Sequence, residues 1–525
     1  MSRKRTKVLD CTLRDGGYCN NWKFGAQNIT RLIRSLEEAN IDIIECGFVT
    51  KNVSYDKDST KFPNFEKISQ VIPETKKKCM YVCMINYGEY DVNEIPNVSD
   101  TRVDGIRVAF HKKDMKLAID YADKLIKKGY KVFLQPMVSL NYTEEEFVEL
   151  IRCANEIEPF AFYIVDSFGG MKGSDLLRLF YCVENLLNEN IAIGFHSHNN
   201  MQLAYSNAEM LLTIKTSRSL IIDASIYGMG RGAGNLNTEL IVESLNDFEG
   251  EKYYLTPILT VIDHVLNRLY QDKSWGYSIP NYLSAKNNVH PNYANYLVEK
   301  QTLRIQDMDM IFARMSKEKK AEFDKNYIDN MYFSYMQNGK CYETNLGLLK
   351  NVLQGQSVLI IAPGKSSVSE KDKVERFIKS EKPIIISINF EYKYANVDYI
   401  FVSNLRRYEE LSEKAKRKCI LTSNVLDSGE VLKVDYSSLL NDVEAVKDNA
   451  GLMLIDLLIK INVKNIRIAG MDGYLYACRQ NYSDESLEFI TEKGKFDERN
   501  EGMRVMLKKY SCCTDIKFIT TSQFM

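Results

Sequence analysis

The first 250 residues alternate short apolar runs with amphipathic stretches, and this alternation limits the folds open to the chain. Eight runs are strand-like: 7–13, 41–48, 80–85, 105–110, 131–137, 160–165, 192–195 and 220–225. Between most of them apolar residues recur at i, i+3 and i+4, which predicts helices at 28–39, 115–128, 144–156, 175–187 and 201–215. Strands that alternate with helices indicate parallel βα units.

About eight such units in roughly 250 residues is the size of a TIM (β/α)8 barrel, which we expect for residues 1–250. A doubly wound open sheet is the alternative, but this many units would make a large one. The pattern then becomes helical, with many Tyr and Asn residues, and predicts a helical extension over the barrel mouth at 251–350. Residues 351–525 return to apolar runs (357–362, 383–388, 399–402, 419–422 and 466–469), which predict a smaller Rossmann-like α/β domain.

Charge and composition exclude several classes of function. The 69 Lys and Arg residues nearly balance 70 Asp and Glu residues, so bulk charge does not favour nucleic-acid binding. No apolar run is long enough to span a bilayer, and no apolar segment follows the basic N-terminus as in a secretory signal. The 12 cysteines are scattered, often within predicted strands, as is typical of buried thiols in a reducing compartment. We therefore expect a cytoplasmic protein that binds neither nucleic acid nor membrane.

Polar residues gather where a barrel would place its chemistry, at the C-terminal ends of the strands. They follow or end the first, second, fourth, sixth, seventh and eighth runs: Arg14, Asp15, Glu45, Arg107, Asp166, Ser167, His196, His198 and Asn235. This agreement predicts one site at the mouth of the barrel.

Two of the five histidines, His196 and His198, stand one residue apart at the end of an apolar run. Residues two apart on an extended strand point the same way, so both imidazoles can meet one divalent ion. Asp15 can add an oxygen ligand. Two core imidazoles without a metal would be hard to satisfy, so a purely structural explanation is weak.

Two separated motifs carry a family resemblance: Asp10-Cys11-Thr12-Leu13-Arg14-Asp15-Gly16-Gly17 and His196-Ser197-His198-Asn199-Asn200. With the later Gly-rich segment 228–235, they make residues 7–240 resemble the DRE-TIM metallolyase (HMGL-like) superfamily. Its members include hydroxymethylglutaryl-CoA lyases, isopropylmalate and homocitrate synthases, and 4-hydroxy-2-oxovalerate aldolases, the branch that this chain resembles most.

The resemblance implies a divalent ion held by Asp15, His196 and His198, with Asn235 near it. It also implies that Arg14 hydrogen-bonds an enolate oxygen, and it favours Mn²⁺ or Mg²⁺. Co²⁺ and Zn²⁺ also suit imidazoles combined with a carboxylate.

One position departs from the family pattern. Where oxovalerate aldolases have a histidine that serves as the catalytic base, this chain has Tyr18. A tyrosine with its ordinary pKa near 10 is a poor base at neutral pH. The base is therefore Tyr18, or a residue such as His290 in the helical extension, or the substrate alcohol differs.

Five further side chains have a functional interpretation, and four of them also have a structural one. Position and resemblance favour a catalytic role for Glu45 and substrate-binding roles for Arg107, Asp166, Ser167 and Asn199. Structurally, Glu45 or Arg107 would serve as an ion-pair partner inside the barrel, and Asp166 and Ser167 would cap the next helix.

The C-terminal region resembles, more distantly, the sialyltransferase-like and motility-accessory-factor families. The similarity lies in Pro363-Gly364-Lys365-Ser366 after a strand, with Asn389, Ser403-Asn404 and Gly470-Met471-Asp472-Gly473. The first turn lacks the full spacing of a phosphate-binding P-loop. Binding of a nucleotide or nucleotide-sugar is one hypothesis, and a module used only for association is the other.

These observations predict a metal-dependent aldolase that joins a 2-oxo acid such as pyruvate to an aldehyde, in carbohydrate or surface-polysaccharide metabolism. An acyl-CoA Claisen-condensing synthase is the alternative, because the same metal and arginine serve that reaction. A barrel that has lost catalysis and a nucleotide-binding C-terminal domain form the third hypothesis. A homo-oligomer is expected because such barrels commonly associate.

Overall fold

The computed structural model describes residues 6–74, 79–300, 302–337, 343–425, 431–475, 481–487 and 493–525. The chain forms two compact units, Met1–Asn295 with Met315–Phe323, and Tyr296–Arg314 with Asp324–Met525. The helical residues 251–350 are therefore divided between the two units. No helix among the described residues is long and apolar enough to cross a membrane.

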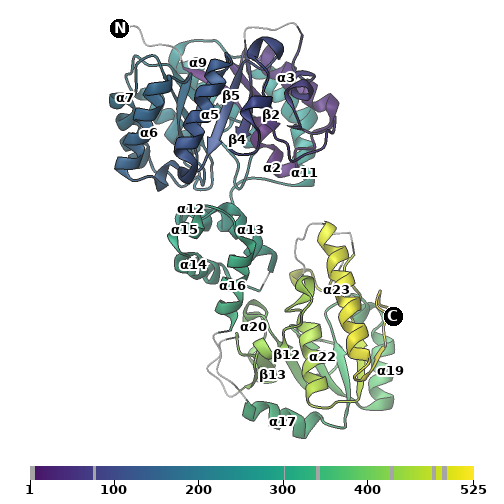
Figure 1. The fold of residues 1–525 in the computed structure, drawn as a ribbon. Coiled ribbons are helices and arrows are strands. Elements are labelled where there is room, and N and C mark those ends of the chain that lie inside the picture. The colour runs from purple at the N-terminus through teal and green to yellow at the C-terminus, as the bar shows by residue number, and fades with distance from the viewer. Residues whose placement is uncertain are drawn as a thin grey trace. The chain divides into compact units, whose positions relative to one another are not determined.

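The first unit contains a closed barrel of eight parallel strands (Figure 1). The strands are β1 (Lys7–Asp10), β2 (Ile43–Val49), β4 (Met80–Asn86), β5 (Gly105–Phe110), β6 (Lys131–Pro136), β7 (Ala161–Asp166), β8 (Ala192–Ser197) and β9 (Leu220–Ala224). Pairing of β1 with both β9 and β2 closes the sheet, and the two-residue strand β3 (Lys61–Phe62) extends β2. The predicted TIM barrel is confirmed, and each predicted run contains or overlaps one strand.

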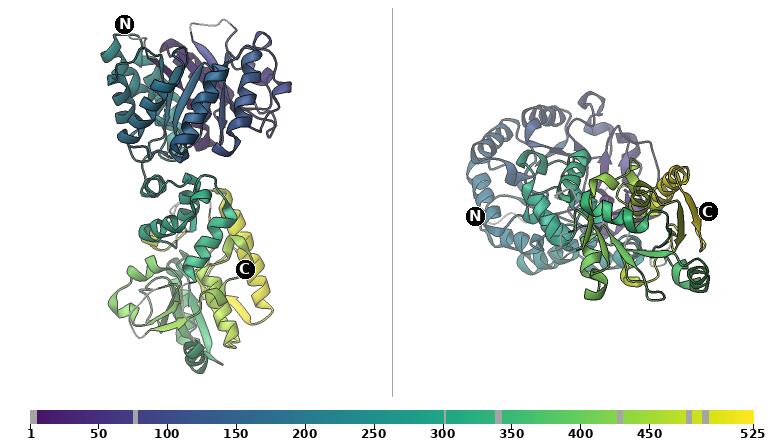
Figure 2. Two further views of the ribbon diagram at one scale, coloured as in Figure 1. Left: turned by 60° about the vertical axis from the view of Figure 1, so that its left-hand side comes forward. Right: turned by 90° about the horizontal axis from the view of Figure 1, so that it is seen from below.

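Helices surround the barrel strands, as the end-on view shows (Figure 2). They are α3 (Ala26–Glu38), α4 (Phe65–Ser69), α5 (Met115–Lys127), α6 (Glu144–Ile157), α7 (Gly173–Leu186), α8 (Ala204–Thr213) and α9 (Thr238–Glu249). Their apolar faces pack on the outside of the barrel in one large core. A second, smaller apolar cluster involving the strands includes Leu9, Ile43, Val82, Phe133 and Ile221.

Two short helices position the first motif above β1. These are α1 (Thr12–Asp15) and α2 (Gly17–Asn20). Asp10 accepts hydrogen bonds from the backbone N–H of Thr12 and from the hydroxyl of Thr238, at 2.9 and 2.6 Å. Burial raises the pKa of Asp10 to about 6. The turn after β1 is thereby tied to the start of α9.

The helical region begins with α10 (Leu255–Val261), a π-helical turn (Ile262–Leu266), α11 (Asn267–Asp272) and α12 (Ile279–Lys286). It continues with α13 (Pro291–Lys300), α14 (Ile305–Arg314), α15 (Lys317–Lys320), α16 (Lys325–Met336) and α17 (Glu343–Leu353). A Cβ added to Gly170, in the loop after β7, would lie 3.0 Å from the carbonyl oxygen of Ala285. The end of α12 thus packs on a loop at the C-terminal end of the barrel.

The second unit contains a seven-stranded parallel sheet in the order β14-β13-β12-β11-β10-β15-β16. The strands are β10 (Ser357–Ile361), β11 (Ile384–Ile388), β12 (Tyr399–Val402), β13 (Cys419–Thr422), β14 (Leu432–Val434), β15 (Asn465–Ala469) and β16 (Asp515–Phe518). Helices packed on the sheet include α19 (Lys371–Glu381), α22 (Ala450–Lys460) and α23 (Lys493–Ser511) (Figure 1). The strand order reverses at β10, as in Rossmann-like domains, so the second predicted fold is also confirmed.

Candidate metal centre

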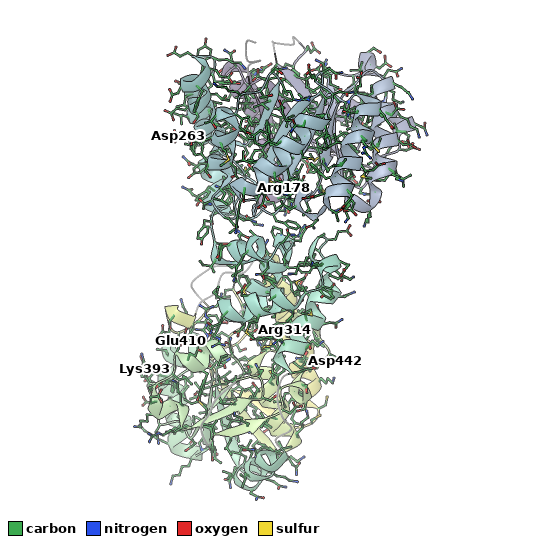
Figure 3. All side chains as sticks on the ribbon, turned by 90° about the vertical axis from the view of Figure 1, so that its left-hand side faces the viewer. Arg178, Asp263, Arg314, Lys393, Glu410 and Asp442 are labelled. Carbon is green, nitrogen blue, oxygen red and sulfur yellow. The ribbon has the colours of Figure 1, made fainter. Side chains whose placement is uncertain are left out.

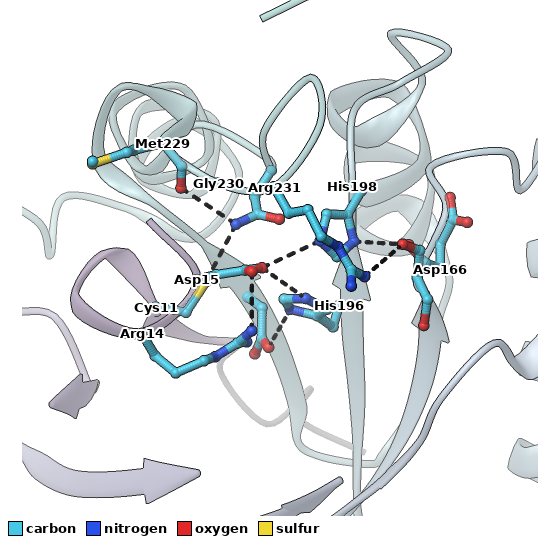
Figure 4. Close-up of polar contacts among 12 residues, drawn as sticks. Cys11, Arg14, Asp15, Asp166, His196, His198, Met229, Gly230 and Arg231 are labelled. Carbon is cyan, nitrogen blue, oxygen red and sulfur yellow. Dashed lines mark hydrogen bonds and ion pairs between the residues drawn. The ribbon is translucent and has the colours of Figure 1, made fainter. Parts of the chain in front are cut away.

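Three side chains converge at the C-terminal end of the barrel (Figure 4): Asp15 at the end of α1, His196 in β8 and His198 just after β8. The Nε2 atoms of His196 and His198 each lie 3.3 Å from Oδ2 of Asp15. All three residues are almost fully buried. The alternation of the two histidines therefore brings both imidazoles to one carboxylate, as the sequence predicted.

The outer nitrogen of each imidazole has a fixed acceptor. Nδ1 of His196 lies 2.8 Å from Oδ2 of Asp223, and Nδ1 of His198 lies 3.1 Å from the backbone oxygen of Asp166. A backbone carbonyl can only accept, so Nδ1 of His198 carries the proton and its Nε2 lone pair faces Asp15. A lone pair that faces a carboxylate is the arrangement expected where a cation sits between the two.

The charges of Asp15 and His198 agree with that arrangement, whereas for His196 burial lowers the pKa but the contacts with Asp15 and Asp223 outweigh it and raise the pKa. Burial raises the pKa of Asp15, but the guanidinium of Arg14 and the two imidazoles outweigh it and hold the pKa well below its ordinary value. Burial lowers the pKa of His198, and the nearby Arg231 adds to this. Asp15 is therefore ionised and His198 neutral at neutral pH, the states that metal ligands require.

Asn235 and Cys11 border the same point. Oδ1 of Asn235 is buried without a hydrogen-bond partner in the described structure, while its Nδ2 lies 3.4 Å from the carbonyl of Met229. Cys11 lies close enough to Asp15 and His196 to share an ion with them. Burial raises the pKa of its thiol well above the ordinary value, and the thiol donates to the carbonyl of Ala224 at 3.2 Å. Since only a thiolate binds metal well, Cys11 is a neighbour of the site and not a ligand.

A buried ion-pair network supports Arg14. Oε2 of Glu45 accepts from Nε of Arg14 at 2.9 Å and from Nη1 of Arg107 at 2.6 Å. Arg107 also pairs with Asp223, which in turn accepts from the hydroxyl of Tyr163 at 2.9 Å. Nη2 of Arg14 is buried without a partner among the described residues, so it is the donor left for a ligand.

The ion-pair network fixes the side chains of Glu45 and Arg107 inside the barrel. Both side chains have no exposed surface. Two carboxylates occupy the guanidinium of Arg107, which therefore lies behind Glu45 and Asp223 as a support. This contact is the structural interpretation that the sequence left open for Arg107. Only Nε of Arg107 lacks a partner among the described residues, so it is the one atom that could donate to a substrate.

The predicted substrate-binding residues after β7 and β8 organise loops. The carboxylate of Asp166 accepts from the backbone N–H groups of Gly170 and Met171 at 3.1 and 3.0 Å. Oγ of Ser167 accepts from the backbone N–H of Val138 at 2.8 Å. Oδ1 of Asn199 accepts from the backbone N–H of Ala204 at 3.2 Å, at the start of α8. The side chains of all three residues therefore hold loops that follow the barrel strands, and the backbone oxygen of Asp166 also contacts His198.

Tyr18, Arg231 and His290 meet beside the metal centre. The guanidinium of Arg231 lies 5.3 Å from the ring centre of Tyr18, and its Nη1 lies 3.3 Å from Nε2 of His290. Burial raises the pKa of Tyr18 above its ordinary value. Burial and the charge of Arg231 hold the pKa of His290 well below its ordinary value. At neutral pH the phenol is protonated and the imidazole is neutral.

Sequence reasoning assigned no role to Asp223 or Arg231. Asp223 ends an apolar run near the C-terminal end of a strand, which is the same signal that identified Glu45. Arg231 stands in the Gly-rich segment after the last strand, where no periodicity singles out one side chain.

The comparisons with known proteins cover the barrel. The family model described as HMGL-like matches residues 5–252. Residues 5–252 form an HMGL-like domain. A 4-hydroxy-2-oxovalerate aldolase of Geobacillus genomosp. 3 is 25% identical over 250 residues, which are 47% of this chain and 72% of that protein. The corresponding aldolase of Pelotomaculum thermopropionicum is 25% identical over 268 residues, 50% of this chain and 77% of that protein.

A solved structure shares the fold of the HMGL-like domain. The carboxyl transferase domain of Rhizobium etli pyruvate carboxylase is 14% identical with a TM-score of 0.50, and the match covers 66% of this chain and 65% of that one. This likeness shows the fold alone. The family match and the named relatives confirm the predicted superfamily and the predicted class of enzyme, an aldolase-type lyase.

Proposed function

We propose that the HMGL-like domain is a divalent-metal-dependent aldolase that acts through the enolate of a 2-oxo acid such as pyruvate. The main support is the pair of imidazole Nε2 atoms that lie 3.3 Å from one oxygen of Asp15. A 2-oxo acid carries the carbonyl and carboxylate oxygens that a divalent ion in such a site would attract.

Asp15, His196 and His198 would hold the ion, with the amide oxygen of Asn235 beside them. Nε2 of His198 and Oδ1 of Asn235 are buried without a hydrogen-bond partner in the described residues, and both imidazoles face one oxygen of Asp15, which suits a cation. Two imidazoles with oxygen ligands suit Mn²⁺, and we favour Mn²⁺ or Mg²⁺ over Co²⁺ or Zn²⁺. When bound, the ion acts as a Lewis acid that polarises the carbonyl of the 2-oxo acid.

Arg14 would stabilise the enolate. Its unpartnered Nη2 is available to donate to the oxygen on which negative charge develops. Glu45 fixes the guanidinium through Nε, and Arg107 fixes Glu45 from behind. This preorganisation lets Arg14 stabilise charge without rearranging during the reaction.

Tyr18 is the side chain that we assign to proton transfer. Carbon–carbon bond formation turns the aldehyde oxygen into an alkoxide, which needs a proton. Because Tyr18 is protonated at neutral pH, it can donate in this direction. His290 fits the predicted role of base less well, because Nδ1 already accepts from the backbone N–H of Asn292 at 3.2 Å, which leaves the ring proton on Nε2.

For the second unit we propose a nucleotide or nucleotide-sugar ligand, and with it a role in carbohydrate or surface-polysaccharide metabolism. The strand order reverses between β10 and β15, and ligands of doubly wound sheets bind outside such a point. A Cβ on Gly364 would lie 2.3 Å from the carbonyl of Gly470, so the two loops meet there. Calorimetric titration with uridine and cytidine nucleotides tests this proposal, and no heat with any of them would contradict it.

The compartment and the oligomeric state complete the proposal. The ten described cysteines are free thiols, which supports the cytoplasm. We propose a homo-oligomer because such barrels commonly associate. Sedimentation analysis that gives a monomer would contradict this proposal.

Deuterium incorporation into pyruvate tests the aldolase proposal. We expect exchange of the methyl protons in D₂O with Mn²⁺ or Mg²⁺, measured by mass spectrometry, and loss of exchange with EDTA. His198→Ala should lose the exchange, whereas Asp263→Asn, an exposed site on the first unit (Figure 3), should keep it. Exchange that persists in His198→Ala would refute the metal site. Release of free thiol from acetyl-CoA with a 2-oxo acid would instead favour the Claisen synthase.

A further inference from the structure

Arg231 carries a charge that no acidic side chain compensates. No ion pair joins it to an Asp or Glu among the described residues. Its polar contacts there are to the backbone oxygen of Ser167, at 3.2 Å from Nη2, and to Nε2 of His290, at 3.3 Å from Nη1. Nε of Arg231 is buried without a hydrogen-bond partner in the same part of the chain. The residue as a whole is only half-buried, but a guanidinium with a buried, unpartnered N–H is a donor available to an anion.

The titratable groups around Arg231 do not supply that anion. Tyr18, His198, His290 and His111 face it. Burial raises the pKa of the Tyr18 phenol, and an imidazole carries no negative charge whether it is neutral or protonated.

Three carboxylates around the site have other partners. The carboxylate of Asp15 pairs with Arg14 and lies 3.3 Å from both imidazoles of the candidate metal centre. That of Asp166 accepts from two backbone N–H groups in the loop after β7. Glu322 pairs with Lys113 and lies 3.7 Å from Nε2 of His111. Among the described residues, no carboxylate therefore forms an ion pair with Arg231, and its positive charge is left for a ligand.

His290 points a second donor at the same space. Its Nδ1 accepts the backbone N–H of Asn292 at 3.2 Å, so the proton of the neutral ring is on Nε2. Nε2–H and Nη1–H of Arg231 are then two donors 3.3 Å apart, and neither can accept from the other. Two facing donors are satisfied by one acceptor between them, such as a carboxylate or phosphate oxygen.

The second cation of the site has a different environment. Arg14 is held by Asp15 and Glu45, with Nη2 left for the enolate. A 2-oxo acid has one carboxylate, which the metal centre can accommodate. A neutral acceptor such as a simple alkanal has no group that would pair with the charge of Arg231.

We propose that Arg231, with the Nε2–H of His290, binds an anionic group on the acceptor aldehyde, so that the acceptor is an aldehyde that carries a carboxylate or a phosphate. The inference rests on the aldolase function proposed above. In the addition, the methyl carbon of the 2-oxo acid loses a proton and bonds to the aldehyde carbon. The aldehyde oxygen gains a proton, so the reaction needs no oxidant or reductant.

Matched pairs of acceptors test the proposal. Butanal is compared with 4-oxobutanoate, and glycolaldehyde with glycolaldehyde phosphate, by product formation from pyruvate with Mn²⁺ present. We expect the native protein to prefer the charged member of at least one pair by about 10- to 100-fold in kcat/KM, the range of a charge-assisted hydrogen bond. The preferred pair tells carboxylate from phosphate. Arg231→Gln should lose most of the preference, and Arg231→Lys should recover part of it.

Arg178→Gln is the matched control, since Arg178 is a half-exposed arginine on the outside of the first unit (Figure 3). It should keep the preference. Equal use of charged and neutral acceptors by the native protein would overturn the proposal. A rise in the pyruvate KM for deuterium exchange in Arg231→Gln, without loss of acceptor preference, would also overturn it by moving the arginine to the donor.

Equilibrium binding separates this inference from the aldolase proposal. Succinate and 2-phosphoglycolate, which cannot react, should bind the native protein about 10-fold or more tightly than they bind Arg231→Gln. If they do so while pyruvate shows no exchange, the anion site stands and the aldolase function fails. If exchange occurs and neither anion distinguishes the two proteins, the aldolase function stands and the anion site is refuted.

Discussion

Asp223→Asn tests the orientation of the proposed metal ligand His196. Oδ2 of Asp223 accepts from Nδ1 of His196 at 2.8 Å and also pairs with Arg107, while Oδ1 accepts from the hydroxyl of Tyr163. An amide with its oxygen in the place of Oδ2 keeps both of the first two contacts. Its nitrogen then faces the Tyr163 hydroxyl, which can turn and accept. The substitution therefore removes the charge and keeps the shape.

The magnitude follows from that geometry. Removing the outer partner of a metal-binding histidine weakens metal affinity by about 10- to 100-fold. Because the hydrogen bond itself survives in Asp223→Asn, we expect the lower end, about tenfold or about 1.4 kcal/mol. Arg107 keeps Glu45 but loses its second carboxylate, so the free energy of unfolding should also fall, by about 3 kcal/mol.

Mn²⁺ binding measured by electron paramagnetic resonance of the free ion gives the affinity, and urea unfolding without metal gives the stability. Asp263→Asn, whose side chain is 78% exposed, is the matched control and should change neither. A Mn²⁺ affinity within about twofold of the native value, in a variant that remains folded, would refute the assignment of His196 as a ligand supported by Asp223.

Three further substitutions test the surroundings of the site. Glu45→Gln leaves the buried guanidinium groups of Arg14 and Arg107 without their shared carboxylate. We therefore expect the free energy of unfolding to fall by about 3 kcal/mol and pyruvate exchange to be lost. Unchanged urea unfolding would contradict the pairing. Gly234 has a φ of +86° and a Cβ there would lie 1.9 Å from a backbone oxygen, so Gly234→Ala should displace Asn235 and weaken Mn²⁺ binding, and native affinity would exclude Asn235 from the centre. Burial raises the pKa of Asp10 to about 6, so the native state retains a proton that the unfolded chain releases near pH 4. Asp10 should then contribute a loss of stability of up to about 3 kcal/mol as the pH rises from about 4 to 6, and the change with pH in urea unfolding of Asp10→Asn should be smaller by that amount.

The barrel was predictable because its signal is repeated along the chain. Each unit pairs a short apolar run with a helix of regular apolar spacing, and the run 105–110 coincides with β5. The edge strands β14 and β16 of the second sheet escaped prediction. Leu432–Val434 and Asp515–Phe518 are short and mix charged with apolar residues, which no periodicity separates from a loop.

The metal centre was predictable from position, and its hydrogen bonds were not. The rule that barrel chemistry lies at the C-terminal ends of strands identified Asp15, Glu45 and both histidines of the pair. The direction of the ring proton on His290 depends on the backbone N–H of Asn292, which only the structure supplies. The sequence therefore offered His290 as a base, whereas its contacts make it a donor.

The candidate metal centre and the proposed anion site are held by different parts of the fold, and this difference bears on substrate specificity. Tyr163, Asp223, Arg107, Glu45 and Arg14 form one continuous chain of buried polar contacts, and most of it lies on barrel strands. The proposed enolate donor and the partner of the proposed ligand His196 are thus held by the rigid part of the fold, where precise chemistry is best placed.

The anion pair has a different origin. Arg231 belongs to a Gly-rich loop, and His290 lies in the helical region beyond the matched family segment, which ends at residue 252. Loops and appended helices can change without disturbing the barrel strands. A metal-dependent aldolase can therefore keep its donor chemistry in the barrel and acquire its acceptor preference from these two segments. On this argument, substitution of Arg231 or His290 changes which aldehyde is used, and the step that forms the enolate is retained.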